Sequence, residues 1–214
     1  MRLLGIEGGG TTWVAVIAED KPDNIVERAE FETRDPESTL RDVREWFTQR
    51  VYDSVGVATF GPVDAIRSSK TYGYITATPK PGWRDTDVLG LLGLRAETKP
   101  VAFDTDVNAP ALAEYTSLKQ QRGAEGLTSC AYVTVGTGVG VGLVVNGGTV
   151  HGLMHPEAGH MYVPTLPDDT FGGNCPFHGC CVEGMCGTPA LAARLNLPPA
   201  ALKDLPDDHP VWDI

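Results

Sequence analysis

Basic residues are scarce in this sequence. Lysine and arginine number 17 against 28 acidic residues, which gives a formal net charge of −11 over 214 residues. Nucleic-acid binding depends on lysine and arginine patches that neutralise phosphates, so we expect no nucleic-acid partner. Long apolar runs are missing as well. The stretch 131–145 is interrupted by glycine and threonine and is shorter than a bilayer requires, so we also expect no membrane partner.

The amino-terminal residues lack the features of a secretory signal. Met1 to Leu4 lead directly into Gly5, without an extended apolar region or a cleavage site, and we therefore expect a cytoplasmic protein. Cysteine is limited to five residues, four of which fall between positions 175 and 186. Because cytoplasmic thiols stay reduced, this cluster indicates a metal site rather than a disulfide framework.

The overall composition, with 42% hydrophobic and 21% charged residues, is that of a globular chain with a sizeable core. A helix is expected after Asp35, which is a plausible N-cap, with Pro36 in the first turn. Apolar patterning predicts strands over 2–6, 13–18, 54–59, 101–103, 129–135 and 140–145, and helices over 36–50, 107–118 and 189–195. From about Val163 the chain is expected to be rich in loops.

A strand–glycine turn–strand pattern at the amino terminus recurs in a second unit that begins near Gly123. The repeat predicts a duplicated α/β architecture with a cleft between two lobes. We place the amino-terminal lobe at residues 1–118 and a partial carboxy-terminal lobe at residues 119–214.

Two glycine turns follow predicted strands. Glycine lets backbone N–H groups approach an anion closely, so a pair of such turns could hold a polyphosphate from both sides. Either turn alone is equally well explained as a tight hairpin turn. Neither has the spacing and lysine of a P-loop, which argues against a Walker-type NTPase. The first turn comprises Gly8, Gly9, Gly10, Thr11 and Thr12, and the second comprises Gly136, Thr137 and Gly138 and extends to Gly140.

Asp104 and Asp106 lie between a predicted strand and a predicted helix. A carboxylate at such a position can point into a cleft and accept the proton of an attacking hydroxyl in phosphoryl transfer. An aspartate at a helix start is also a common N-cap, and the residues alone favour that interpretation. One aspartate could cap the helix while the other faces the cleft.

Histidine and cysteine in the second half have the spacing of metal ligands. A tetrahedral zinc ion takes four nitrogen or sulfur ligands, and a closed set of four indicates a structural site. Cys180 is an alternative to Cys181, and the sequence does not choose between them. The candidate ligands are His160, Cys175, His178 and Cys181. A loop braced in this way would hold nearby polar side chains, such as Glu157 and Glu183, for hydrogen bonding to a sugar.

Together these motifs resemble the fructokinase branch of the ROK sugar kinases. The resemblance runs over nearly the whole chain and is most specific in the last two segments. It rests on residues 5–11, 58–64, 72–76, 78–83, 104–109, 136–140, 151–160 and 175–181.

The resemblance implies an actin-like ATPase (ribonuclease H-like) fold and ATP-dependent phosphorylation of a hexose, most often fructose. Asp106 would be the general base. Asn108, Glu157 and Glu183 would lie in the sugar site, and the glycine turns would hold ATP with Mg²⁺. It also implies a structural Zn²⁺ and a homodimer. Glucose, mannose and an N-acetylhexosamine remain alternative substrates.

Three features depart from the family pattern. Thr12 stands where a lysine is usual, and Pro110 stands where a small helix former is usual. Family members also continue beyond the position of Ile214 with a segment that holds adenosine. A catalytically impaired sugar-binding or regulatory protein is therefore the main alternative, and a zinc-stabilised interaction module is a weaker one.

Overall fold

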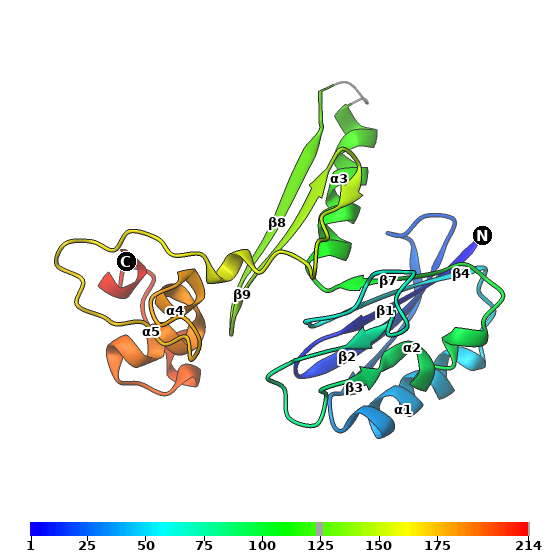
Figure 1. Cartoon of the computed structure of the whole chain (residues 1–214), viewed down its shortest axis with the longest axis horizontal. Coiled ribbons are helices and arrows are strands. Elements are labelled where there is room, and N and C mark those ends of the chain that lie inside the picture. The colour runs from blue at the N-terminus through cyan, green and yellow to red at the C-terminus, as the bar shows by residue number, and fades with distance from the viewer. Residues whose placement is uncertain (123–125, 214) are drawn as a thin grey trace.

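The computed structural model describes residues 1–122 and 126–213. Its larger sheet has five strands in the order β3-β2-β1-β4-β7 and contains the amino terminus (Figure 1). Strands β1, β2 and β3 are antiparallel neighbours, whereas β4 and β7 run parallel to β1. The strands are β1 (Arg2–Gly8), β2 (Thr12–Glu19), β3 (Ile25–Glu32), β4 (Ser54–Thr59) and β7 (Val101–Thr105).

The parallel strands bring three segments of the chain to one edge of this sheet. The register aligns Gly8 with Thr59, and Thr59 with Thr105, so the carboxyl ends of β1, β4 and β7 are level. The first glycine turn therefore lies at the same edge as the turn after β4 and the start of the segment after β7.

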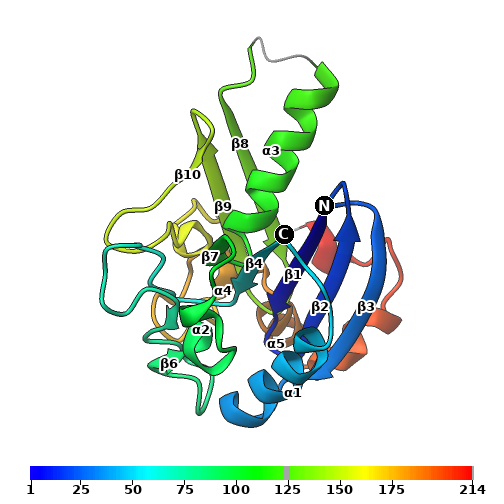
Figure 2. The same cartoon turned by 90° about the vertical axis from the view of Figure 1, so that its right-hand side faces the viewer.

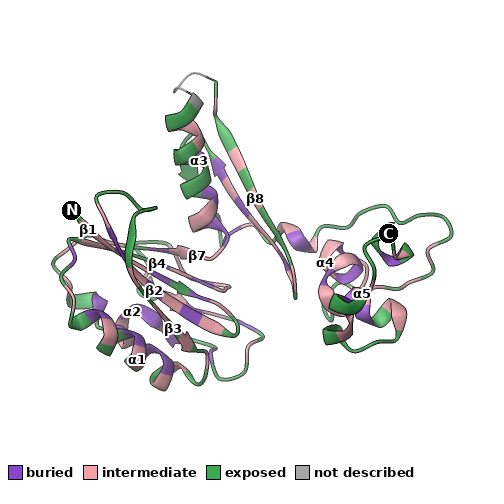
Figure 3. Ribbon diagram, turned by 180° about the vertical axis from the view of Figure 1, so that it is seen from behind, coloured by how far each residue is buried: buried purple, intermediate pink, exposed green. Residues whose placement is uncertain are grey.

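One helix packs on the larger sheet because its apolar residues share a face. Helix α1 (Pro36–Thr48) buries Leu40, Val43 and Phe47 in the core, and Figure 3 shows buried residues along its inner side. The carboxylate of Asp35 accepts a hydrogen bond from the Ser38 amide at 2.9 Å, which confirms the predicted N-cap. Helix α2 (Val88–Leu91) lies beside α1 and adds Val88 and Leu89 to the same core.

A compact segment between β4 and β7 is held by Trp83. This residue is fully buried, stacks on Trp13 with ring centroids 5.5 Å apart, and meets Phe60 edge-on at 5.3 Å. Its indole N–H donates to the Arg34 carbonyl at 2.9 Å. The segment also contains strands β5 (Tyr74–Ile75) and β6 (Thr86–Asp87), with the 3₁₀ turn η1 (Leu94–Ala96) after α2.

A second sheet has the strand order β10-β9-β8 and is covered by α3 (Asn108–Arg122), as Figure 2 shows. Ala111 and Tyr115 of the helix pack against Val144 of the sheet. Gly142 permits the close approach, because a Cβ there would lie 1.9 Å from the Val107 carbonyl oxygen. The strands are β8 (Ser129–Val135), β9 (Val139–Val145) and β10 (Gly148–Thr149).

The last part of the chain consists of short helical turns and loops. Arg194 forms two hydrogen bonds of 2.9 Å to the carboxylate of Asp169, and both side chains are largely buried. This pair ties the long loop before residue 175 to the helical part. The elements are η2 (Ala158–His160), α4 (Val182–Cys186), α5 (Thr188–Leu195), η3 (Pro199–Asp204) and η4 (Pro210–Asp213).

Most predicted elements are present, and two strands have the predicted bounds, 54–59 and 129–135. Strand β3 was not predicted, because its charged residues alternate with small or apolar ones at the exposed edge of the sheet. The short helix α4 and the turn η4 were also not predicted. The division into lobes at residue 118 stays a prediction. Gly123, near which the second unit was expected to begin, lies outside the described residues.

Candidate active site and metal centre

Asp106 lies at the sheet edge where β1, β4 and β7 end. Its amide donates a hydrogen bond of 2.9 Å to the Thr59 carbonyl, which fixes the residue beside the end of β4. Neither Asp104 nor Asp106 is the N-cap of α3 in the structure, so the N-cap interpretation is wrong. The Asn108 amide donates instead to the hydroxyl of Thr105, at 3.0 Å. The Asp106 carboxylate is therefore not used as the cap of α3.

The environment of Asp106 raises the pKa of its carboxyl group. Partial burial and the negative charges of Glu7 and Glu157 raise the pKa of Asp106 to about 6, although the nearby His155 acts in the opposite direction. A carboxyl group with this pKa is still mostly ionised at pH 7 and is more basic than a free aspartate. These are the properties that a general base near neutral pH requires.

His155 and Glu157 form a pair close to Asp106. The Nε2 atom of His155 lies 2.7 Å from Oε1 of Glu157, and only 5% of the histidine side chain is exposed. Partial burial acts to raise the pKa of Glu157, but the hydrogen bond and charge of His155 outweigh it and lower that pKa. His155 was not among the predicted site residues. The sequence did offer a signal, because His155 lies two positions before Glu157 in the segment 151–160 on which the family resemblance rests.

The first glycine turn joins β1 to β2. The Gly9 amide donates to the Thr12 carbonyl at 2.9 Å, and the Thr33 hydroxyl donates to the Gly9 carbonyl at 2.9 Å. Gly8 must be glycine, since a Cβ there would lie 2.5 Å from the Trp13 ring. Gly10 and Thr11 are exposed at the tip, where a ligand can reach the backbone.

The second glycine turn joins β8 to β9 and is in contact with Glu183. The Gly136 amide donates to the Gly138 carbonyl at 2.9 Å. The carboxylate of Glu183 accepts a hydrogen bond from the Val139 amide at 3.0 Å, and a Cβ on Gly138 would lie 2.6 Å from it. Glu183, predicted to contact sugar, thus contacts the turn that was predicted to hold phosphate.

Asn108 is fully buried between β7 and β9. Its amide nitrogen donates to Asp104 at 3.1 Å, and its amide oxygen accepts from the Leu143 backbone at 3.2 Å. Asp104 is also hydrogen-bonded to Thr149 and to His151, each at 3.0 Å. Asn108 and Asp104 therefore join the two sheets in this structure, while the predicted contact of Asn108 with sugar stays a prediction.

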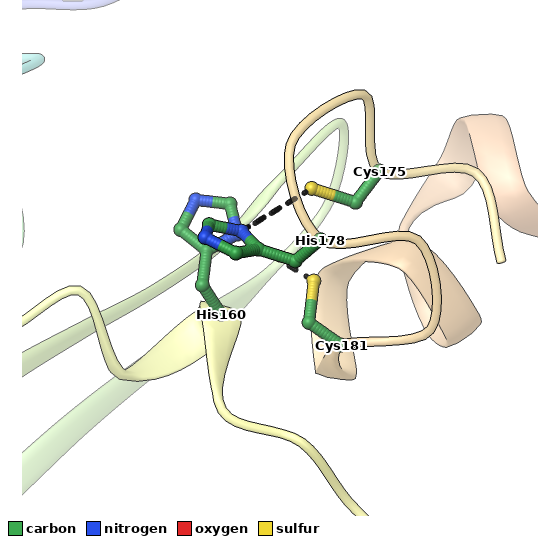
Figure 4. A group of neighbouring side chains, drawn as sticks. All are labelled: His160, Cys175, His178 and Cys181. Carbon is green, nitrogen blue, oxygen red and sulfur yellow. Dashed lines mark hydrogen bonds between the residues drawn. The ribbon is translucent and has the colours of Figure 1, made fainter.

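Four predicted metal ligands converge on one point, as Figure 4 shows. The ligand atoms of His160, Cys175, His178 and Cys181 all lie within 4.8 Å of one another. Sulfur-to-nitrogen distances are 3.5 Å for Cys181–His160, 3.7 Å for Cys175–His160 and 3.8 Å for Cys175–His178. Tetrahedral zinc with ordinary bond lengths separates such ligands by about 3.6 Å, so the four side chains fit a zinc ion.

The position of the two adjacent cysteines distinguishes them. Cys181 is fully buried with its sulfur in this cluster, whereas Cys180 is not part of the group. A tight turn presents Cys175 and His178, because the Gly179 amide donates to the Cys175 carbonyl at 2.9 Å. The geometry therefore selects Cys181 from the two alternatives that the sequence left open.

The metal-ligand loop adjoins the second glycine turn. A pocket of about 200 Å³ lies between them and has both Thr137 and Cys175 in its wall. The turn η2 also packs closely on β9, since a Cβ on Gly159 would lie 1.8 Å from the Val139 carbonyl oxygen. The segment 155–160 thus connects the surroundings of Asp106 with the four candidate metal ligands.

Comparison with solved structures shows which class of fold this is. The chain superposes along its full length on 72% of a ROK hexokinase from Thermus thermophilus, with a TM-score of 0.69 and 25% sequence identity. The expected α/β class with an actin-like ATPase fold is therefore confirmed. No helix in the described ranges is both long and apolar enough to cross a membrane.

The sequence matches the ROK family over residues 3–205, and the chain belongs to that family. It is 40% identical over 210 residues to a protein from Lactococcus lactis named fructokinase, covering 98% of this chain and 68% of the relative. A protein from Pediococcus pentosaceus, also named fructokinase, is 38% identical over 214 residues, covering 100% of this chain and 71% of the relative.

Proposed function

We propose that this protein catalyses ATP-dependent phosphorylation of a hexose, with fructose as the preferred acceptor. The observation that carries the proposal is the position and chemistry of Asp106. Asp106 lies at the sheet edge formed by the aligned carboxyl ends of β1, β4 and β7, next to the first glycine turn. The pKa of its carboxyl group is raised to about 6. In this function it accepts the proton of the sugar hydroxyl as that oxygen attacks the terminal phosphorus of ATP.

Fructose is preferred over other hexoses because of the relatives. The two relatives named fructokinase align with 98% and 100% of the chain at 40% and 38% identity, which supports fructose as the acceptor. Glu157 is the side chain we assign to the sugar, since its charge affects Asp106 directly. Asn108 and Glu183 are further candidates for sugar binding.

The two glycine turns are the proposed site for the phosphates of ATP and its Mg²⁺. Exposed backbone at Gly10 and Thr11 supports this assignment for the first turn, and the pocket beside Thr137 supports it for the second. Magnesium neutralises charge on the phosphoryl group when it is bound.

We also propose that His160, Cys175, His178 and Cys181 hold a structural Zn²⁺, because the four ligands close the coordination sphere. The ion would brace the loop that carries Glu157. All five cysteines are free thiols, which fits a cytoplasmic location in which thiolates remain available to metal. The proposal includes two lobes, residues 1–118 and 119–214, and a homodimer, which sedimentation analysis would test.

The decisive experiment is a coupled ADP-release assay of the 214-residue chain with Mg-ATP, zinc and fructose, repeated with glucose, mannose and N-acetylmannosamine. Asp106→Asn removes the base, and Asp23→Asn, at an exposed turn, is the matched control. Fructose-dependent ADP release that is lost only in Asp106→Asn supports the proposal. Folded, zinc-loaded protein that binds fructose but releases no ADP would instead identify a sugar-binding protein without kinase activity.

A further inference from the structure

The first glycine turn carries no charge of its own, because its five residues are three glycines and two threonines. The fold brings a cation to it from elsewhere in the chain. The ammonium group of Lys80 donates a hydrogen bond to the Gly10 carbonyl, across 70 positions of sequence. An ammonium group has three N–H donors, and the Gly10 carbonyl uses one of them. Lys80 forms no ion pair with any carboxylate in the described ranges.

The backbone that carries Lys80 is fixed before any ligand arrives. The Lys80 carbonyl accepts a hydrogen bond from the Trp83 amide at 3.2 Å, and the Lys80 amide donates to the Thr78 hydroxyl at 3.3 Å. Trp83 is fully buried and stacks on Trp13, the residue that directly follows the glycine turn. One aromatic pair therefore holds both the turn and the segment with the lysine, so the backbone from which the Lys80 side chain extends is preorganised.

The charges around this turn explain why a cation is required. Glu7 directly precedes the turn and is close enough to Asp106 to raise its pKa, and Glu157 acts in the same direction. The carboxylates of Glu7, Asp106 and Glu157 would therefore repel an incoming triphosphate. Lys80 is the lysine that the fold places at the turn, with its Nζ atom 5.9 Å from the centre of the Phe60 ring. Phe60 follows β4 at the same sheet edge as Asp106, so the cation is on the side where transfer takes place.

We propose that Lys80 binds the terminal phosphate of the phosphoryl donor at the first glycine turn and supplies the positive charge that the turn lacks. This inference rests on the proposed kinase function and assigns to it a residue outside both glycine turns. The terminal phosphate is chosen because the turn adjoins Asp106, and the phosphate nearest the base is the one that is transferred. A lysine acts at such a site as a compact point charge with several donors.

The test measures binding of Mg-ATP and Mg-ADP by calorimetry to the wild type, Lys80→Met and Lys21→Met. Lys21 is exposed in the turn beyond the far end of β2, so its replacement changes the net charge equally without reaching the site. A charged hydrogen bond lost in Lys80→Met should weaken Mg-ATP binding by at least about tenfold, and Mg-ADP binding by less than about threefold. Lys21→Met should bind both nucleotides as the wild type does.

A measurement on the wild type keeps the test valid if Lys80→Met folds poorly. Lysines are acetylated with and without Mg-ATP, and modification is followed by peptide mass spectrometry. Mg-ATP should slow modification of Lys80 at least about tenfold while leaving Lys21 and the exposed Lys70 unaffected. Equal modification of Lys80 in both conditions overturns the proposal. Wild-type protein that binds neither Mg-ATP nor inorganic tripolyphosphate overturns it as well.

The outcomes for Lys80 and for the kinase function are separable. Nucleotide binding that depends on Lys80, without phosphorylation of any hexose, would support the role of Lys80 and refute the kinase function. Fructose phosphorylation with unchanged ATP affinity and unchanged kcat in Lys80→Met would do the reverse.

Discussion

The imidazole ring of His155 lies directly against Gly61: a Cβ on residue 61 would come within 2.8 Å of the ring carbon Cε1 and within 3.3 Å of Nε2. Because the histidine is almost completely buried, its ring has little room to move aside. Gly61 therefore fixes the orientation in which Nε2 of His155 meets the Glu157 carboxylate.

Gly61→Ala should displace the His155 ring and break its hydrogen bond to Glu157. Loss of a charged hydrogen bond at the proposed sugar site corresponds to a decrease of about 10- to 100-fold in kcat/KM for fructose. Steady-state kinetics would measure it. Gly56→Ala in β4, the strand just before this turn, is the control, since a Cβ there meets no atom within 4 Å. Equal kinetics for the two variants would show that the position of His155 is unimportant to the reaction.

The strands around this site could be predicted from sequence more completely than its contacts. Strand 54–59 and the glycine turns follow from apolar runs and local turn chemistry. The four candidate metal ligands follow from the spacing of histidine and cysteine in short segments, whereas Asp106 was identified as the base only through the family resemblance, because the residues alone favoured an N-cap. The contacts Gly61–His155 and Gly10–Lys80 join distant segments, and no periodicity in a single sequence indicates such pairs.

Strand β3 shows a different limit. Glu27, Arg28, Glu30 and Glu32 make it resemble a polar loop, yet it pairs with β2 along nearly its whole length. An edge strand can carry such charges because one side faces water, and the charges also discourage pairing with other chains. The deciding information is the neighbouring strand, which local sequence does not contain.

Removal of the Asp106 carboxylate should abolish most of the activity. General-base catalysis contributes about 10²- to 10⁴-fold, so Asp106→Asn should lower kcat by that factor while fructose binding persists. In the wild type, activity should fall as the pH decreases through about 6, where this carboxyl group becomes protonated. A pH–rate profile for kcat/KM tests this point. A profile that stays flat between pH 5 and 8 would exclude Asp106 as the base.

The same substitution should increase the stability of the fold at neutral pH. The pKa of Asp106 is about 6 in the folded protein and 3.8 as its ordinary value, so the folded state binds more protons between these values. The contribution of Asp106 to the free energy of unfolding is fully present below pH 3.8 and is lost as the pH rises through 6. Asp106→Asn avoids that loss, which amounts to at most about 3 kcal/mol at pH 8.

Urea denaturation of Asp106→Asn and the wild type at pH 8 and pH 5 would measure this effect. The advantage of the variant should shrink by roughly half at pH 5, where the wild-type carboxyl group is mostly protonated in the folded state. Asp23→Asn, at an exposed turn, should have wild-type stability at both pH values. An Asp106→Asn variant less stable than the wild type at pH 8 would contradict the raised pKa.

Adjacent cysteines provide a matched pair for testing the metal centre. Cys181→Ser removes a buried sulfur that lies 3.5 Å from Nδ1 of His160, whereas Cys180→Ser changes a cysteine outside the cluster. Zinc content measured by atomic spectroscopy should be one ion per chain in the wild type and Cys180→Ser. Zinc affinity should fall at least about tenfold in Cys181→Ser, because structural zinc depends on all four ligands.

Loss of the ion should also weaken sugar binding, because His160 is only three residues from Glu157 and lies in the same short segment. Without the metal, this segment loses one of its fixed points, and fructose affinity should decrease together with the thermal stability of the chain. Calorimetric titration of fructose into chelator-treated wild type and into both serine variants would measure the coupling. Fructose binding that is unchanged after complete removal of zinc would show that the packing of η2 on β9 alone positions Glu157.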